Sequence, residues 1–301
     1  MLKNTFLILA LFFITCNAAI AQLNIVATNP DLASIAEEIG KEKVKISTLG
    51  KGYQDPHFVD PRPNFVLNLN KADILLLMGM ELEIGWLPVL ITGSRNSKIS
   101  DHNSTGYIDC SKFIINKLEI PHEVDRRMGD VHAQGNPHYM LDPRNGVSVA
   151  RGISERFSQI DPENSRFYKR NYIKFKNKLQ NKIIDWEDQL NNYKGLNIIT
   201  YHKTWIYFLN WAGFNYLTSI EPKPGIPPSP SDIIRIANIA KEYDKKLIIT
   251  ANYFPTRTGK LIAKKIDSSF LSLPVMVEGN KEVTSYVELF DYIIKKIQSN
   301  I

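Results

Sequence analysis

Three histidines are the residues of this chain whose side chains are best suited to a chemical role. His57 and His138 each follow a proline, and His202 comes just after a short apolar run. A neutral imidazole is a good ligand for a borderline metal ion, and three of them with one open or carboxylate position form a common zinc arrangement. Because Mn2+ and Mg2+ prefer more carboxylate oxygens, a histidine-rich set favours Zn2+. The residue types therefore predict a metal site.

The spacing of these histidines does not by itself show that they meet. They lie 81 and 64 residues apart, and the local motif His-Glu-x-x-His is absent. The simplest alternative is that each is an incidental loop residue. His102 and His122 lie in polar loops and are expected to be solvated. His132, six residues before His138, is a candidate auxiliary or transient ligand.

The N-terminal half supplies a strand-to-loop junction for the first histidine. Apolar runs predict strands over residues 23–28, 44–49 and 72–78. A helix is predicted from 30 to 40, capped by Asn29. His57 lies in the loop after the second strand, and such loops at the carboxyl ends of strands bind ligands in open α/β sheets. Asp60 and Pro61 are predicted as the N-cap and first residue of the next helix.

The C-terminal half repeats the alternation of strands and helices. Strands are predicted over residues 196–200, 215–220, 246–251 and 270–274, and helices over 256–266 and 283–297, with a further helix starting at Ser231. His202 follows the first of these strands, in the same kind of junction as His57. The loop 221–230 is rich in proline, so we expect it to be semi-rigid.

One long amphipathic stretch lies between the two halves. Asp161 and Pro162 predict a helix start, and apolar residues recur at intervals of three and four as far as Leu190, with an end near Gly195. About 32 residues would give a rod of roughly 48 Å. It could be the core helix of a single large domain. The strand–helix alternation on both sides favours a rigid strut between two domains.

The predicted fold class is α/β, with two domains that each hold a small parallel sheet flanked by helices, joined by one long rigid helix. The predicted division is a signal peptide at 1–21, an N-terminal domain at 22–160, the connecting helix at 161–194 and a C-terminal domain at 195–301. The 37 basic and 31 acidic residues are scattered, so no nucleic-acid partner is expected. Glycine-rich nucleotide-binding motifs are absent from the sequence.

The first residues have the pattern of an export signal. Lys3 supplies the positive charge, residues 6–14 the apolar core, and an Ala-Ile-Ala segment ends at Ala21, after which we expect cleavage and release to the periplasm. Cys16 leaves lipoprotein processing as the alternative. Once Cys16 is removed, Cys110 is the only cysteine, so an intramolecular disulfide is impossible.

The segments around the three histidines resemble those of a known family. They are Asp55-Pro56-His57 with Asp60-Pro61-Arg62-Pro63, Gly135-Asn136-Pro137-His138-Tyr139 with Asp142-Pro143, and Tyr201-His202 with Trp205 and Tyr207-Phe208. In this order they resemble the metal-binding solute-binding proteins of ABC importers, zinc/manganese group (ZnuA- or TroA-like, cluster A-I). The resemblance covers nearly the whole mature chain, and the loop from Glu221 to Gly225 resembles a feature of one branch.

The resemblance implies a metal ion buried between two α/β domains, with His57, His138 and His202 as its ligands. It also implies delivery of the metal, Zn2+ or alternatively Mn2+, to an ABC permease in the inner membrane, with no enzymatic activity. We expect a monomer. Many relatives place an aspartate after the last strand as fourth ligand. Here that loop has none, so Glu278 or a water is expected, and the histidine-rich acidic loop of many zinc relatives is also missing.

A zinc-dependent hydrolase is the rival from another class, because three histidines with an open position can also activate water. It would need a general acid or base, and the histidine loops offer only Asp55, Asp60 and Asp142. A surface adhesin or structural protein finds no support in repeats or low-complexity segments.

Overall fold

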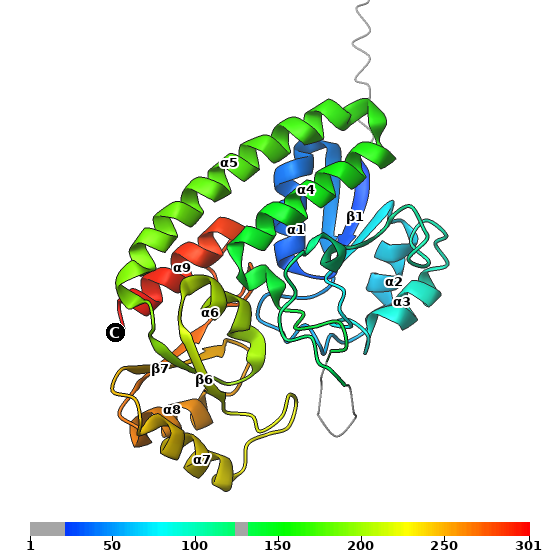
Figure 1. The fold of residues 1–301 in the computed structure, drawn as a ribbon. Coiled ribbons are helices and arrows are strands. Elements are labelled where there is room, and N and C mark those ends of the chain that lie inside the picture. Colours follow the sequence, from blue (N-terminus) through cyan, green and yellow to red (C-terminus); the bar gives the residue numbers. More distant parts are fainter. Residues whose placement is uncertain (1–21, 124–131) are drawn as a thin grey trace, which may run out of the picture.

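The computed structural model describes residues 22–123 and 132–301, which form two four-stranded parallel sheets (Figure 1). Each sheet is flanked by helices, as the sequence predicts, and helix α5 (Ser165–Leu190) runs along both halves. The predicted signal peptide lies outside the described residues. Within the described part of the chain, no helix is long and apolar enough to cross a membrane.

The first sheet has the strand order β2-β1-β3-β4. Its strands are β1 Leu23–Ala27, β2 Val44–Thr48, β3 Ile74–Leu77 and β4 Tyr107–Asp109, and its helices are α1 Pro30–Gly40, α2 Pro63–Asn70, α3 Leu87–Ser94 and α4 Pro143–Ile160. Alternate residues of the central strands enter two apolar clusters, one with α1 and α4 and one with α2 and α3. All of β3 is buried, which explains its continuous apolar run.

The second sheet has the same pattern of order, β6-β5-β7-β8. Its strands are β5 Asn197–Thr200, β6 Asn215–Ser219, β7 Lys246–Ala251 and β8 Ser269–Leu273, and its helices are α6 Ile206–Ala212, α7 Pro230–Ala240, α8 Thr256–Lys265 and α9 Tyr286–Gln298. Helices α7 and α8 pack on one face, and α6 and α9 on the other. The predicted strands of both sheets are thus found within one or two residues of their predicted ends.

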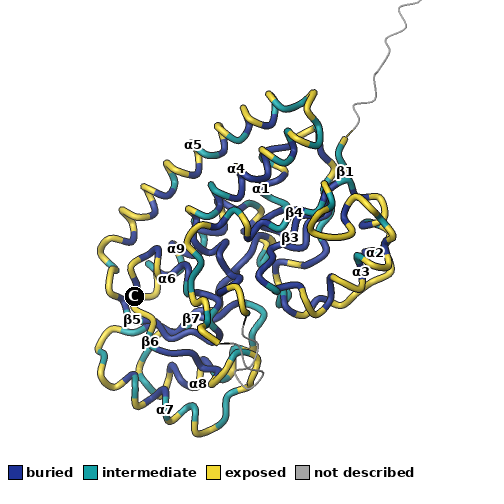
Figure 2. Tube along the Cα trace, turned by 45° about the vertical axis from the view of Figure 1, so that its right-hand side comes forward, coloured by how far each residue is buried: buried dark blue, intermediate teal, exposed yellow. Residues whose placement is uncertain are grey.

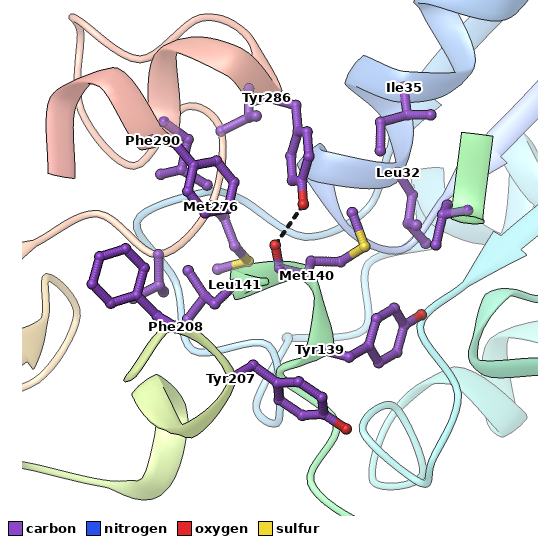
Figure 3. Packing of buried hydrophobic residues seen from close by; sticks show 14 of the residues in the cluster. Leu32, Ile35, Tyr139, Met140, Leu141, Tyr207, Phe208, Met276, Tyr286 and Phe290 are labelled. Atoms are coloured by element: carbon purple, nitrogen blue, oxygen red, sulfur yellow. Dashed lines mark hydrogen bonds between the residues drawn. The ribbon is translucent and has the colours of Figure 1, made fainter. Parts of the chain in front are cut away.

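The two halves share one apolar core. The cluster runs from Leu32 on α1, through the short 3-10 helix η4 (Tyr139–Leu141), to Phe208 on α6 and Phe290 on α9 (Figure 3). The Tyr286 hydroxyl donates a hydrogen bond of 2.6 Å to the Met140 carbonyl inside it. Because separating the halves would expose this cluster to water, the two sheets are held in a fixed relation.

The predicted long helix is confirmed: α5 continues into the 3-10 turn η6 (Asn191–Tyr193), and with the turn before it the helical stretch spans residues 162–193. A 3-10 turn, η5 (Pro162–Asn164), precedes α5, whose 26 residues span about 39 Å. Asp161 does not cap it: its carboxylate accepts hydrogen bonds from the Tyr168 hydroxyl and the Asn164 amide instead. Helix α4 lies beside α5, and α5 also packs on α1 and α9 (Figure 1). Its outer face is exposed (Figure 2).

The helix after the His57 loop also starts later than predicted. Asp60 and Pro61 were expected at its start, but α2 begins at Pro63 with Arg62 as its N-cap. A residue before proline is pushed into extended backbone, and Arg62 has φ −115° and ψ 145°. The helix therefore cannot begin before the second proline. Helices α3 and α4 and strand β4 were not assigned from the sequence.

Candidate metal centre

His57 is held by its own loop, between β2 and α2. The carboxylate of Asp55, two residues earlier, lies 2.7 Å from His57 Nδ1 and also accepts the His57 backbone N–H at 3.0 Å. Trp86 Nε1 donates to the Pro56 carbonyl at 3.0 Å. Burial opposes ionisation of Asp55, but the hydrogen bonds from His57 help to outweigh it, and the pKa of the carboxyl is lowered.

His202 is held by a residue from the neighbouring strand. It follows β5, and Glu221 follows β6, which pairs with β5. Glu221 Oε2 lies 2.9 Å from His202 Nδ1, and the Glu221 backbone N–H donates to the Tyr201 carbonyl at 3.0 Å. The ring of Phe254 lies beside the imidazole, with centroids 6.0 Å apart. His202 is thus fixed in orientation by a buried carboxylate.

His138 lies between the two halves and, among the residues that the structure describes, has no carboxylate partner. Its backbone N–H donates to Asn136 Oδ1 at 2.9 Å, and the Asn136 amide donates to the Lys203 carbonyl of the C-terminal half at 2.8 Å. Its Nε2 atom is buried and has no hydrogen-bond partner within the described part of the chain. Burial, and then the neighbouring imidazoles, hold the pKa of His138 well below its ordinary value. The ring is therefore neutral at neutral pH, as a metal ligand must be.

The structure brings the three predicted histidines together. One nitrogen from each of His57, His138 and His202 lies within 4.8 Å of the others, and the residues are only 9, 7 and 8% exposed. In His57 and His202 the Nδ1 atom faces a carboxylate, so it carries the proton and leaves the Nε2 lone pair for a ligand. This arrangement can hold a metal ion through three nitrogens.

The other candidate residues fall in different places. Glu278 does not join the cluster: it is exposed and lines a groove with Pro30 and Glu37, so it does not supply the expected fourth ligand. His132 does approach, with its Nε2 3.2 Å from His57 Nε2, and it lines a cavity of about 350 Å³ with His138 and His202.

Asp142 and Asp60, two of the three carboxylates considered as general acids or bases, lie outside the histidine cluster. Asp142 caps α4 through the Arg144 backbone N–H and forms an ion pair with the Arg144 guanidinium. Asp60 is exposed. Asp55 and Glu221 act on the outer side of two imidazoles, a role that sequence reasoning did not assign. Asp55 could have been identified from its position two residues before His57. For Glu221 the only indication was its position after the strand that pairs with β5.

Comparison with known proteins shows the family of this chain. The sequence model of the ZnuA family, zinc-uptake complex component A, periplasmic, matches residues 25–300. The chain belongs to the ZnuA family. Members of this family are substrate-binding components of metal ABC transporters and not enzymes, so the hydrolase alternative is excluded. This ZnuA-family chain is thus an exported metal-binding component of a transporter.

Individual relatives are distant. The manganese ABC transporter substrate-binding lipoprotein PsaA of Streptococcus mitis is 23% identical over 289 residues, which cover 93% of this chain and 89% of that protein. The metal ABC transporter substrate-binding lipoprotein SloC of Streptococcus mutans is 30% identical over 162 residues, covering 53% of this chain and 49% of that protein.

Solved structures share the fold of this ZnuA-family chain. A crystal structure of ZnuA has a TM-score of 0.77 at 23% identity and covers 93% of this chain and 99% of that one. A Mn-bound periplasmic metal binding protein from Candidatus Liberibacter asiaticus has a TM-score of 0.75 at 18% identity, covering 92% and 99%. At these identities the likeness shows the architecture of two parallel sheets and a long helix.

Proposed function

We propose that the protein captures Zn2+ with His57, His138 and His202 and delivers it to an ABC permease in the inner membrane. The observation that carries the proposal is His138 Nε2, which is buried, unpartnered and close to two histidines whose Nδ1 atoms are already engaged. A buried polar atom without a partner is costly unless a ligand satisfies it. Nitrogen ligands favour Zn2+ over Mn2+.

Manganese is the alternative cargo, since PsaA of Streptococcus mitis is named for it. Among the described residues, the cluster of potential ligands contains histidines only. The nearby carboxylates of Asp55 and Glu221 are taken up by His57 and His202. A site without free carboxylate oxygens is a poor one for Mn2+, so Zn2+ is the proposed cargo.

The sequence pattern also supports a proposal for how the protein is exported, processed and divided into domains. Export ends with cleavage after Ala21, with a lipid anchor at Cys16 as the alternative, and the mature monomer divides into domains at 22–160 and 195–301 joined by the helix 161–194. Because one apolar core spans both domains, metal release would use small tilts and loop shifts rather than wide opening.

The test is metal binding by the mature protein, measured by competition with a chelator. We expect about one Zn2+ per chain and tighter binding of Zn2+ than of Mn2+. His138→Ala should reduce zinc affinity by at least about a hundredfold, because a first ligand contributes more than an outer partner worth about 10–100-fold. His102→Ala, which removes an exposed imidazole, is the control. Unchanged affinity in His138→Ala would disprove the site.

A further inference from the structure

We propose that His132 is the fourth ligand of this metal site and that Glu81 is the residue that positions it. The inference rests on the proposed function, because it assigns the coordination position that the three histidines leave open. It draws on two features that the three-histidine site does not use: the approach of His132 to His57, and a strained turn at residues 79–86.

The distance between His132 and His57 fits a shared metal ion. Zinc–nitrogen bonds of about 2.0–2.1 Å in a tetrahedron separate two ligand nitrogens by about 3.3–3.4 Å. The two Nε2 atoms are 3.2 Å apart, and the rings stack with centroids 5.3 Å apart. Because Asp55 fixes the proton of His57 on Nδ1, the Nε2 lone pair of His57 points at the same place as Nε2 of His132.

Two other carboxylates of the described residues lie away from the fourth position. Glu278 is exposed and lines a different groove. Glu221 Oε2 is 2.9 Å from His202 Nδ1, on the outer side of that ring. His132 is half-buried and lines the same cavity as His138 and His202. Of these three side chains, only His132 approaches a histidine of the cluster at its Nε2 atom.

Glu81 holds the segment that carries His132. Its Oε2 atom accepts the backbone N–H of Ala133, the residue after His132, at 3.1 Å. Glu81 is the third of three successive residues with positive φ, after Gly79 at 76° and Met80 at 51°, and its own φ is 64°. Residues other than glycine rarely adopt a positive φ. Backbone strain of this kind persists only where the surrounding structure enforces it.

The surroundings of this turn connect it to both histidine loops. The buried Glu83 carboxylate accepts the backbone N–H groups of Met78 and Gly79, at 2.7 and 3.1 Å, which fixes the start of the turn. At the other end Trp86 donates to the Pro56 carbonyl, directly before His57. The 79–86 turn therefore holds the His57 loop through Trp86 and the His132 segment through Glu81. We infer that the strain serves to place these two imidazoles against each other.

The first experiment tests the ligand. Zinc affinity is measured by chelator competition for the wild type, His132→Ala and the control His102→Ala, and each protein is also loaded with Co2+ to record its visible spectrum. We expect His132→Ala to weaken zinc binding about 10–100-fold and to change the Co2+ bands, because an oxygen from water replaces a nitrogen. The control should match the wild type. Wild-type affinity and an unchanged spectrum in His132→Ala would overturn the assignment.

The second experiment tests positioning by Glu81. Glu81→Ala should weaken zinc binding several-fold, and Glu81→Gln, which keeps an acceptor oxygen for Ala133, should restore it. In the His132→Ala background, Glu81→Ala should have no further effect. An equal loss in both backgrounds would show a purely structural role and refute positioning. Melting of the metal-free variants checks that each folds.

The two proposals fail separately. If the wild type binds no zinc, or if His138→Ala leaves its affinity unchanged, the proposed function is wrong. If His138→Ala abolishes tight binding while His132→Ala does not weaken it, the three-histidine site stands and only the assignment of His132 and Glu81 is wrong.

Discussion

The two halves of the molecule fix a histidine by the same chemistry but from different distances along the chain. In the N-terminal half, Asp55 is two residues from His57, and its side chain is 22% exposed. In the C-terminal half, Glu221 is 19 residues from His202 and its side chain is 7% exposed. Each carboxylate puts the imidazole proton on Nδ1 and turns the Nε2 lone pair inward. A turn achieves this in one half, and strand pairing in the other.

The difference in burial should decide how much zinc affinity is lost when each carboxylate is removed. If Asp55 is removed, water can reach His57 Nδ1 and accept its proton. If Glu221 is removed, His202 Nδ1 is left buried without an acceptor, which costs its full desolvation. The C-terminal half, where strand pairing brings Glu221 to His202, should therefore lose more zinc affinity when its carboxylate is removed.

The largest expected effect comes from comparing the two carboxylates directly. Glu221→Ala should lower zinc affinity by about 100-fold and Asp55→Ala by about 10-fold, the two ends of the range for outer partners of metal-bound histidines. Chelator competition at neutral pH measures both, with Asp101→Ala at an exposed aspartate as the control. Equal losses of zinc affinity in the two variants, or a larger loss in Asp55→Ala, would contradict the proposed difference between the halves.

A smaller effect concerns a contact between the halves. Asp31 on α1 accepts the Val277 backbone N–H of the C-terminal half at 2.8 Å, and burial raises its pKa from 3.8 to about 7. Between about pH 4 and pH 7 the folded chain thus binds this proton more tightly than the unfolded chain does. The free energy of unfolding should therefore fall as pH rises through this window and level off above it.

Asp31→Asn tests this contact, because the amide still accepts the Val277 N–H but cannot ionise. We expect the variant to lose part of the decline with pH and to exceed the wild type in stability above pH 7 by up to about 4 kcal/mol. Denaturant unfolding of metal-free protein from pH 4 to 8 measures it. Glu83→Gln is the matched comparison inside the N-terminal half, where burial also raises the pKa to about 7. An unchanged slope in Asp31→Asn would contradict the assignment.

Much of the fold could be predicted because its signals are local. Short apolar runs give the strands, and the α5 stripe, from Tyr168 to Leu190, is buried almost as its spacing predicts. The start of a helix was harder to predict where two prolines stand close together. The pair at Pro61 and Pro63 offered two possible starts, and the extended backbone of Arg62 selected the second.

The sequence by itself determined the two sheets, the long helix and the three candidate histidines, two of them in loops that follow strands. Residue periodicity, turn chemistry and metal-ligand type are properties of short segments. Tertiary structure decided the rest. The pairing of β6 with β5 brought Glu221 to His202, and a strained turn held the segment beside His132. It also placed Glu278 at the surface. These outcomes depend on contacts between residues far apart in the chain, and no local pattern encodes such contacts.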